Sequence, residues 1–282
     1  MNKNNALSHH FQKIAQLIFV FLVPIFNTSC DNPITGMGPQ PSYIDKHEHK
    51  PMLNVFGVLR PDTLDGKPLS FVHLEESVSA TSFPDNMLVT DAKIKVFEHD
   101  HNLVTDSLEL DYTNLNSTFE TLEYRNIHFY PLPGLTYGIS CVRDGYPELT
   151  SRTTIPLVPA IKENTLFLGA DELSFIILRD SLAALYDIYY VNGPNKYSQR
   201  IRPPAVGDIS VKMDFEPGLT TEGYLIIYAY DAKLSEYMTY NVSIKPNTFR
   251  SNYSTVENGY GCFGSVNFLR KYLSDTTLTR QE

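Results

Sequence analysis

Cys30 is the residue with the most specific chemistry in this sequence, because of the segment that precedes it. Residues 1–29 contain two lysines and no acidic residue, and the first carboxylate of the chain is Asp31. A short apolar run, Ile14–Phe26, is followed by three small polar residues and then by the cysteine. This order is typical of a lipoprotein signal peptide, which is cut before a cysteine whose thiol then carries lipid. We therefore expect residues 1–29 to be a signal peptide and Cys30 to be lipidated.

Two alternatives to lipidation remain open at this stage. Asn27 stands where such signals usually have leucine, so an ordinary signal peptide cut near Ser29 and an uncleaved anchor are both compatible with the sequence. The apolar run is shorter than the ~20 residues that a membrane-spanning helix needs. Acyl chains on Cys30 contribute about 0.8 kcal/mol for each buried CH₂, so two or three chains would attach the protein to a membrane almost permanently.

Two His-x-His pairs are the best candidates for metal binding, His47 with His49 and His99 with His101. Residues two apart on a strand share a face, so both imidazoles of a pair could reach one ion. The first pair lies in a proline-rich tether, and we expect the second at the tip of a hairpin. Solvated turns explain both pairs, and we predict no metal site.

Carboxylates and serines give no catalytic pattern. Two acidic groups stand out: Asp106, Glu109 and Asp111, and then Asp171 with Glu172. Neither has the spacing of a calcium loop, and neither Ser181 nor Ser265 lies in a G-x-S-x-G sequence. We expect solvated acidic faces, no catalytic residue, no cofactor and no enzymatic activity.

Cys141 and Cys262 remain after Cys30 is assigned to lipid. Cys141 follows Leu135, Tyr137 and Ile139 at alternate positions, which places it on an expected core face, whereas Cys262 lies in a glycine-rich segment. We predict two separate thiols, with a disulfide as the alternative, since exported proteins meet an oxidising compartment.

Tyrosines are concentrated in the second half of the chain. The set is Tyr186, Tyr189, Tyr190, Tyr224, Tyr228 and Tyr230. At strand spacing they fit core or rim packing, and the alternative is a stacking platform for a glycan or a peptide. The chain contains no tryptophan, which disfavours the glycan version.

The net charge excludes some partners and the composition favours strands. The formal charge is −9, and it becomes −11 once residues 1–29, with their two lysines and no acid, are removed. No basic stripe is present, so we expect no nucleic acid partner and no electrostatic docking on anionic lipid. The apolar fraction is 42%, aromatic residues make up 12%, and 18 prolines are present, which together favour strands and turns.

The hydrophobic pattern predicts an all-β protein with a minor helical part. We expect a tether over 30–50, a β-sandwich domain over 51–156, a second β-rich domain over 157–272 and a frayed tail over 273–282. The expected strands are Met52–Arg60, Leu69–Glu76, Ala92–Phe97, Leu135–Arg143, Leu149–Ile155, Leu173–Leu178, Leu185–Val191, Asp208–Phe215, Tyr224–Tyr230 and Ser265–Tyr272. Lys233–Val242 has helical spacing and is followed by a proline. Gly259–Gly264 is expected to form a loop in which Phe263 closes over the second domain.

Four motifs, taken in order, resemble a family of lipoproteins from the Bacteroidota known as domain of unknown function 4249. After the lipidated cysteine come a first strand like Leu53–Leu59 and a strand of the form nA.V.v, here Asp91–Val96. Next comes a stretch of the form pG.tY.l.v..Gy..lts.t.iP, here Pro133–Pro156, and then a terminal N..GyG.FGs segment, here Asn258–Ser265. The residues around Asn258 depart from the usual asparagine–isoleucine–x–glycine–glycine form.

This resemblance implies an outer-membrane lipoprotein with an immunoglobulin- or transthyretin-like N-terminal domain, anchored through lipid on Cys30. Such proteins are often encoded beside TonB-dependent receptors, which makes a TonB-dependent receptor a candidate partner. No catalytic residues are established for the family, so none are carried over. We expect a lipid-anchored binding or interaction module whose ligand, and whose face of the membrane, the sequence leaves open; the alternatives are a surface or periplasmic hydrolase and a structural envelope protein.

Overall fold

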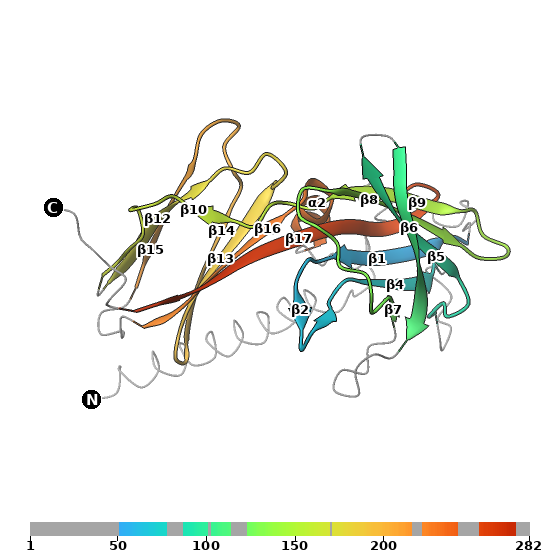
Figure 1. The fold of residues 1–282 in the computed structure, drawn as a ribbon, viewed down its shortest axis with the longest axis horizontal. Coiled ribbons are helices and arrows are strands. Elements are labelled where there is room, and N and C mark those ends of the chain that lie inside the picture. Colours follow the sequence, from blue (N-terminus) through green and yellow to red (C-terminus); the bar gives the residue numbers. More distant parts are fainter. Residues whose placement is uncertain are drawn as a thin grey trace, which may run out of the picture. The chain divides into compact units, whose positions relative to one another are not determined.

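The computed structural model describes residues 51–77, 87–100, 103–113, 123–169, 171–215, 222–241 and 254–274 (Figure 1). The expected signal peptide, Cys30 and the tether lie outside these residues. The described part is mostly β-structure with one helix, and so the expectation of an all-β protein is confirmed.

The described elements before residue 160 are all strands. They are β1 (Leu53–Leu59), β2 (Thr63–Leu64), β3 (Lys67–Pro68), β4 (Phe71–Glu76), β5 (Lys93–Asp100), β6 (Leu103–Thr113), β7 (Glu123–Arg125), β8 (Thr136–Val142) and β9 (Leu149–Thr154). The later elements include the helix. They are β10 (Ala160–Ile161), β11 (Phe167–Leu168), β12 (Glu172–Leu178), β13 (Leu185–Asn192), β14 (Asn195–Ile201), β15 (Ile209–Asp214), β16 (Gly223–Tyr230), α2 (Ala232–Asn241) and β17 (Gly259–Leu273).

The first sandwich consists of β1, β4 to β9 and the beginning of β17. One layer has the order β17-β1-β4-β7, and the other has the order β6-β5-β8-β9. The long strand β6 joins them, because Asp111–Thr113 pairs with β7 while its earlier residues pair with β5. Alternate side chains of both layers meet in one core, among them Val55, Leu74, Ile94 and Ile139.

The second sandwich consists of β10 to β16 and the end of β17. The layer β14-β13-β16-β17 packs on a four-stranded layer made of β10, β12, β11 and β15. The strand β15 shows why the sequence folds in this way: Ile209, Val211 and Met213 are buried, and the residues between them are exposed. Phe215 continues the buried face of β15, as the alternation predicts.

The strand β17 belongs to both sandwiches. Gly259–Ser265 pairs in parallel with β1, and Val266–Leu273 pairs antiparallel with β16 (red in Figure 1). The C-terminal strand therefore completes a sandwich that begins more than 200 residues earlier in the chain. The expected division into domains 51–156 and 157–272 stays a prediction.

Gly259–Gly264 is part of this strand, and the expectation of a loop is wrong. Glycine is needed here for close approach: a Cβ at Gly261, whose φ is +99°, would lie 1.9 Å from the carbonyl oxygen of Val55. The three glycines thus let β17 lie against its neighbours. Leu273 is fully buried at the end of the strand, so it does not belong to a frayed tail; residues 275–282 lie outside the described part.

The regular strands were predictable and the irregular ones were not. All ten expected strands overlap observed strands, and the expected helix is α2. The strands β2, β3, β6, β7, β10, β11 and β14 were missed. All except β6 and β14 have two or three residues, and those two carry few apolar residues on one face. In the described part, no helix has the length and apolar character needed to cross a bilayer.

Candidate functional site

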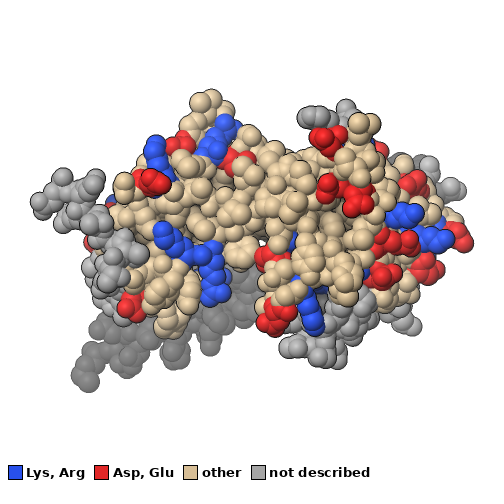
Figure 2. Space-filling view, viewed as in Figure 1, with Lys and Arg blue, Asp and Glu red and all other residues tan. Residues whose placement is uncertain are grey.

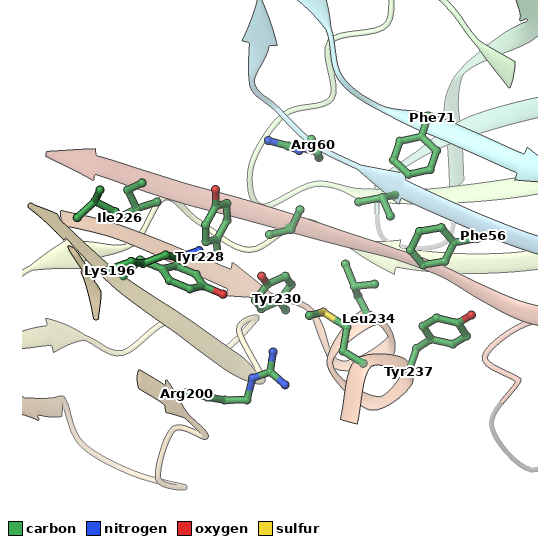
Figure 3. Close-up of a pocket in the computed structure, with 15 residues that line it drawn as sticks. Phe56, Arg60, Phe71, Lys196, Arg200, Ile226, Tyr228, Tyr230, Leu234 and Tyr237 are labelled. Atoms are coloured by element: carbon green, nitrogen blue, oxygen red, sulfur yellow. The ribbon is translucent and has the colours of Figure 1, made fainter. Parts of the chain in front are cut away.

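An open groove of about 750 Å³ lies against the outward face of the layer β14-β13-β16-β17 (Figure 3). Its walls come from the helix α2 and from the outward faces of β1 and β4. We call it the aromatic groove, and its lining residues are Phe56, Val58, Arg60, Phe71, Tyr189, Val191, Lys196, Arg200, Ile226, Tyr228, Tyr230, Leu234, Tyr237, Met238 and Val266.

The strand alternation of β13 and β16 produces the groove floor. Along β16, Leu225, Ile227 and Ala229 point into the second core and are completely buried. The residues that alternate with them, Ile226, Tyr228 and Tyr230, therefore face outward. Both faces of this central strand are apolar, but only one of them is covered by the opposing layer.

Aromatic rings in the groove contact one another. The Tyr228 ring lies 6.0 Å from that of Tyr189, with the planes at 80°, and 5.6 Å from that of Phe268. On the opposite wall, the ring of Phe56 lies 5.5 Å from that of Tyr237 and 5.9 Å from that of Phe71. These packed rings fix the shape of the groove before any ligand binds.

The apolar residues of the groove belong to a third and smaller cluster, separate from the two sandwich cores. Its buried members are Val58, Leu234, Cys262 and Val266, and the partly buried residues packed on them are Phe56, Phe71, Tyr228, Tyr230, Tyr237 and Met238. The helix α2 contributes Leu234, Tyr237 and Met238 to it, at the spacing of one helix face. Leu234 is buried, whereas Tyr237 and Met238 are half-buried and border the open space. The cluster is therefore incomplete on the side that faces the groove.

The described lining contains three basic residues and no acidic one. Lys196 is exposed, with its ammonium 4.3 Å from the centre of the Tyr189 ring. Arg200 donates two hydrogen bonds of 2.7 Å to the buried carboxylate of Asp187, its direct neighbour across the β13–β14 pair. Arg60 is paired with Asp62. On the face shown in Figure 2, basic and acidic side chains are interspersed around an uncharged centre.

Ionisation in the groove is controlled by burial and by this ion pair. Hydrogen bonding to Asp187 raises the pKa of Arg200, so the guanidinium stays charged. Burial raises the pKa of Tyr189, and it raises that of Tyr230 well above the ordinary value, so both phenols stay neutral. The groove thus presents neutral rings beside fixed positive charge.

The predicted tyrosines divide between the second core, the groove and the exposed surface. Tyr186 and Tyr190 are completely buried in the second core. Tyr189, Tyr228 and Tyr230 line the groove. Tyr224 is 40% exposed and stacks under the guanidinium of Arg270 at 4.3 Å.

His99 lies next to the turn of the β5–β6 hairpin, as expected, but its side chain is buried and not solvated, which corrects that part of the expectation. It is in β5, only 6% exposed, because Gly138 on the neighbouring strand leaves space for its ring. Burial, and then the charge of Arg152, lower the pKa of His99 and favour the neutral imidazole. His47, His49 and His101 lie outside the described residues.

The other candidate residues lie apart from the groove, except that Cys262 belongs to the small cluster behind it. Asp106, Glu109 and Asp111 are exposed on β6, and no group of three metal-ligating side chains occurs among the described residues. Glu172 pairs with Lys212 at 2.9 Å. Ser181 is exposed and Ser265 is buried.

Both described cysteines are buried free thiols, so the alternative of a disulfide between Cys141 and Cys262 is wrong. Tyr137, Ile139 and Cys141 share the core face of β8, as their spacing predicts. Cys262 lies in β17 and packs with Val58, Leu234 and Val266.

The groove contains residues that the sequence did not mark as a site. Phe56, Phe71 and Met238 looked like ordinary core residues of a strand or helix, and their local patterns contain no sign of one another. The signal that could have indicated the groove is the presence of apolar residues on both faces of Met52–Arg60 and Tyr224–Tyr230. The core covers one face of such a strand, and the other face needs a second layer or remains as an apolar surface.

Comparisons with known proteins define no family for this chain. No protein-family model and no curated protein matches it. Among solved structures, a segment of two fibronectin type-III domains from chicken tenascin is similar over 80% of this chain and 99% of its own length, with 10% sequence identity and a TM-score of 0.25. A TM-score this low carries no argument about topology or function.

Proposed function

We propose that this protein is a lipid-anchored binding module of the outer membrane, and that the aromatic groove is where it holds a protein partner. The observation that carries the proposal is the groove itself: apolar rings and basic side chains line about 750 Å³ of open space on a β-sheet face. Such a face would normally be covered or polar.

The residue types in the groove favour a protein partner over a small molecule. Interface centres are enriched in tyrosine, phenylalanine, methionine and arginine, and are depleted in acidic residues and lysine. The groove has four tyrosines, two phenylalanines, one methionine and two arginines, and no acidic residue in its described lining. Lys196, which is exposed on β14, departs from this composition. Its ammonium adds a positive charge that is accessible to a partner.

The charge of the lining indicates the kind of segment that fits. In the described lining, Arg60 and Arg200 are each paired with an aspartate, so Lys196 is the side chain whose positive charge can attract a carboxylate. The partner we propose is an extended segment of an outer-membrane protein that carries an apolar side chain next to an aspartate or glutamate. A TonB-dependent receptor is the candidate source, from the family resemblance of the sequence.

Site-specific crosslinking in intact cells tests this proposal. A photoreactive amino acid at Lys196 should crosslink to one outer-membrane protein. The same residue at Lys95, an exposed lysine on the first sandwich, should not. Lys196→Glu should weaken capture of that protein at least about tenfold, while Lys95→Glu should leave capture unchanged.

Two results would count against the groove. Equal crosslinking from Lys196 and Lys95 would mean that contact is nonspecific. Crosslinks from Lys196 to glycan or lipid alone would replace the protein partner with a different ligand.

A further inference from the structure

A second cavity of about 750 Å³ lies on the first sandwich, away from the aromatic groove. It is bordered by β5, β8 and β9, by the segment before β17 and by the first turn of α2. Unlike the groove, it is lined by polar and charged side chains of both signs. Those that carry the argument are Glu148, Ser151, Arg152, Lys233 and Glu257.

His99 has a buried nitrogen without a partner at the wall of this cavity. Its Nδ1 is inaccessible to solvent and makes no hydrogen bond within the part of the chain that the structure describes. The ring lies against β8, where a Cβ on Gly138 would be 2.6 Å from Nε2. Because Nδ1 is closed to solvent and Nε2 lies against Gly138, His99 forms part of the cavity wall and offers neither ring nitrogen to a ligand there.

Two cations border the same space with donors to spare. The Lys233 ammonium donates to Ser151 Oγ at 2.9 Å and to the carbonyl oxygen of Thr255 at 3.0 Å. An ammonium has three protons, so one remains for another acceptor. Arg152 is exposed and forms no ion pair with any described residue.

Two carboxylates complete the lining, and neither forms an ion pair with a described base. Glu148 accepts a hydrogen bond of 2.5 Å from the Ser140 hydroxyl. Glu257 accepts one of 3.2 Å from the Thr150 hydroxyl, beside the backbone bridge that joins these two residues. Charges of both signs therefore face one cavity, and no ion pair joins any two of the described side chains Glu148, Arg152, Lys233 and Glu257.

We propose that this cavity binds a small zwitterion of the α-amino acid type. Its carboxylate faces Arg152 and Lys233, and its ammonium faces Glu148 and Glu257. A ligand with both charges can pair with the cations and with the carboxylates of the lining. A simple anion would leave the carboxylates unpaired, and a simple cation would leave the two bases unpaired. The cavity volume is within the range of small-molecule sites, about 300–1,000 Å³.

Calorimetric titration of the full-length chain in detergent with the twenty L-amino acids tests the proposal. At least one should bind with a Kd below about 1 mM. Its decarboxylated amine and its N-acetyl derivative should each bind at least about tenfold more weakly, because each lacks one charge. Absence of binding by every amino acid, or binding of either derivative as tightly as the amino acid itself, would overturn the assignment.

Variants locate the binding. Arg152→Gln and Glu148→Gln change exposed side chains and should weaken binding about tenfold while leaving thermal unfolding unchanged. Arg179→Gln, an exposed arginine on the second sandwich, is the matched control and should bind normally. Lys196→Glu in the aromatic groove should also bind normally, which separates this site from the proposed partner site. Wild-type affinity in both Arg152→Gln and Glu148→Gln would show that the amino acid binds elsewhere.

Discussion

Gly57 and Phe263 are direct neighbours across the parallel pair of β1 and β17, and the Phe263 ring covers the Cα of the glycine. A Cβ at Gly57 would lie 2.7 Å from Cδ2 of Phe263, closer than carbon atoms normally approach. Phe263 is itself completely buried in the core of the first sandwich. The absence of a side chain at residue 57 thus makes room for an aromatic ring 206 positions later.

Gly57→Ala should destabilise the protein by forcing this ring to move. Replacing the ring by a smaller side chain removes the clash, so Gly57→Ala with Phe263→Leu should be less destabilising than the sum of the single changes. Urea unfolding of the four proteins should give a coupling of about 0.5–3 kcal/mol. Strict additivity would contradict the contact.

Phe263→Ala should lower the free energy of unfolding by about 3–5 kcal/mol, because it leaves a cavity in the first core. Tyr272→Ala, on the same strand but 50% exposed, is the control and should change it by about 0.5 kcal/mol or less. In Phe263→Ala, the melting temperature and the yield of crosslinking from Lys196 should fall together. A normal melt with lost crosslinking would make this segment part of the contact surface.

Asp231→Asn should change how stability depends on pH. Asp231 is 4% exposed and accepts hydrogen bonds from the amides of Leu234 and Ser265 and from the Thr153 hydroxyl. Burial outweighs these bonds and raises its pKa. The folded state therefore favours the protonated acid more than the unfolded state does, and this contribution is lost as the pH rises through the folded pKa.

Urea unfolding from pH 4 to pH 7 measures this effect. The stability of the wild type relative to Asp231→Asn should fall across this range, starting above the unfolded value of about 3.9. Parallel profiles for the two proteins would show that Asp231 has the same pKa in both states.

Cys141 and Cys262 should react slowly with iodoacetamide in the folded protein. Burial raises the pKa of the Cys262 thiol to about 12 and raises that of Cys141 further, so the reactive thiolate is scarce at both positions. Mass spectrometry should find both alkylated quickly in denaturant. Rapid labelling of either thiol without denaturant would show that its strand opens readily.

Cys30→Ala should release the protein from the membrane. Without the thiol no lipid can be attached, and the chain should move to the soluble periplasmic fraction after a carbonate wash. Lys95→Glu, far from the anchor in sequence, should stay in the pellet. Retention of Cys30→Ala in the membrane would favour an uncleaved anchor.

Residue alternation was sufficient to predict much of the β-structure. Along β15, one apolar face and one polar face leave a single way to place the strand against a core, and the same holds for β5 and β8. The helix α2 was equally clear from the spacing of Leu234, Tyr237 and Met238. In these segments the local pattern and the final burial agree because each element buries one face.

Only the tertiary structure decided what the second apolar faces of β1 and β16 contact, and where His99 and the segment Gly259–Gly264 lie. Gly259–Gly264 has the composition of a loop, yet parallel pairing with β1 makes it a strand, and that pairing is between residues far apart in the chain. His99 is buried because of Gly138 on another strand, and the aromatic groove joins Phe56, Tyr228 and Tyr237 from three elements. The sequence by itself therefore determined which residues alternate, and it predicts lipidation at Cys30. Contacts between distant segments decided the sites, because side-chain burial depends on neighbours that no local pattern contains.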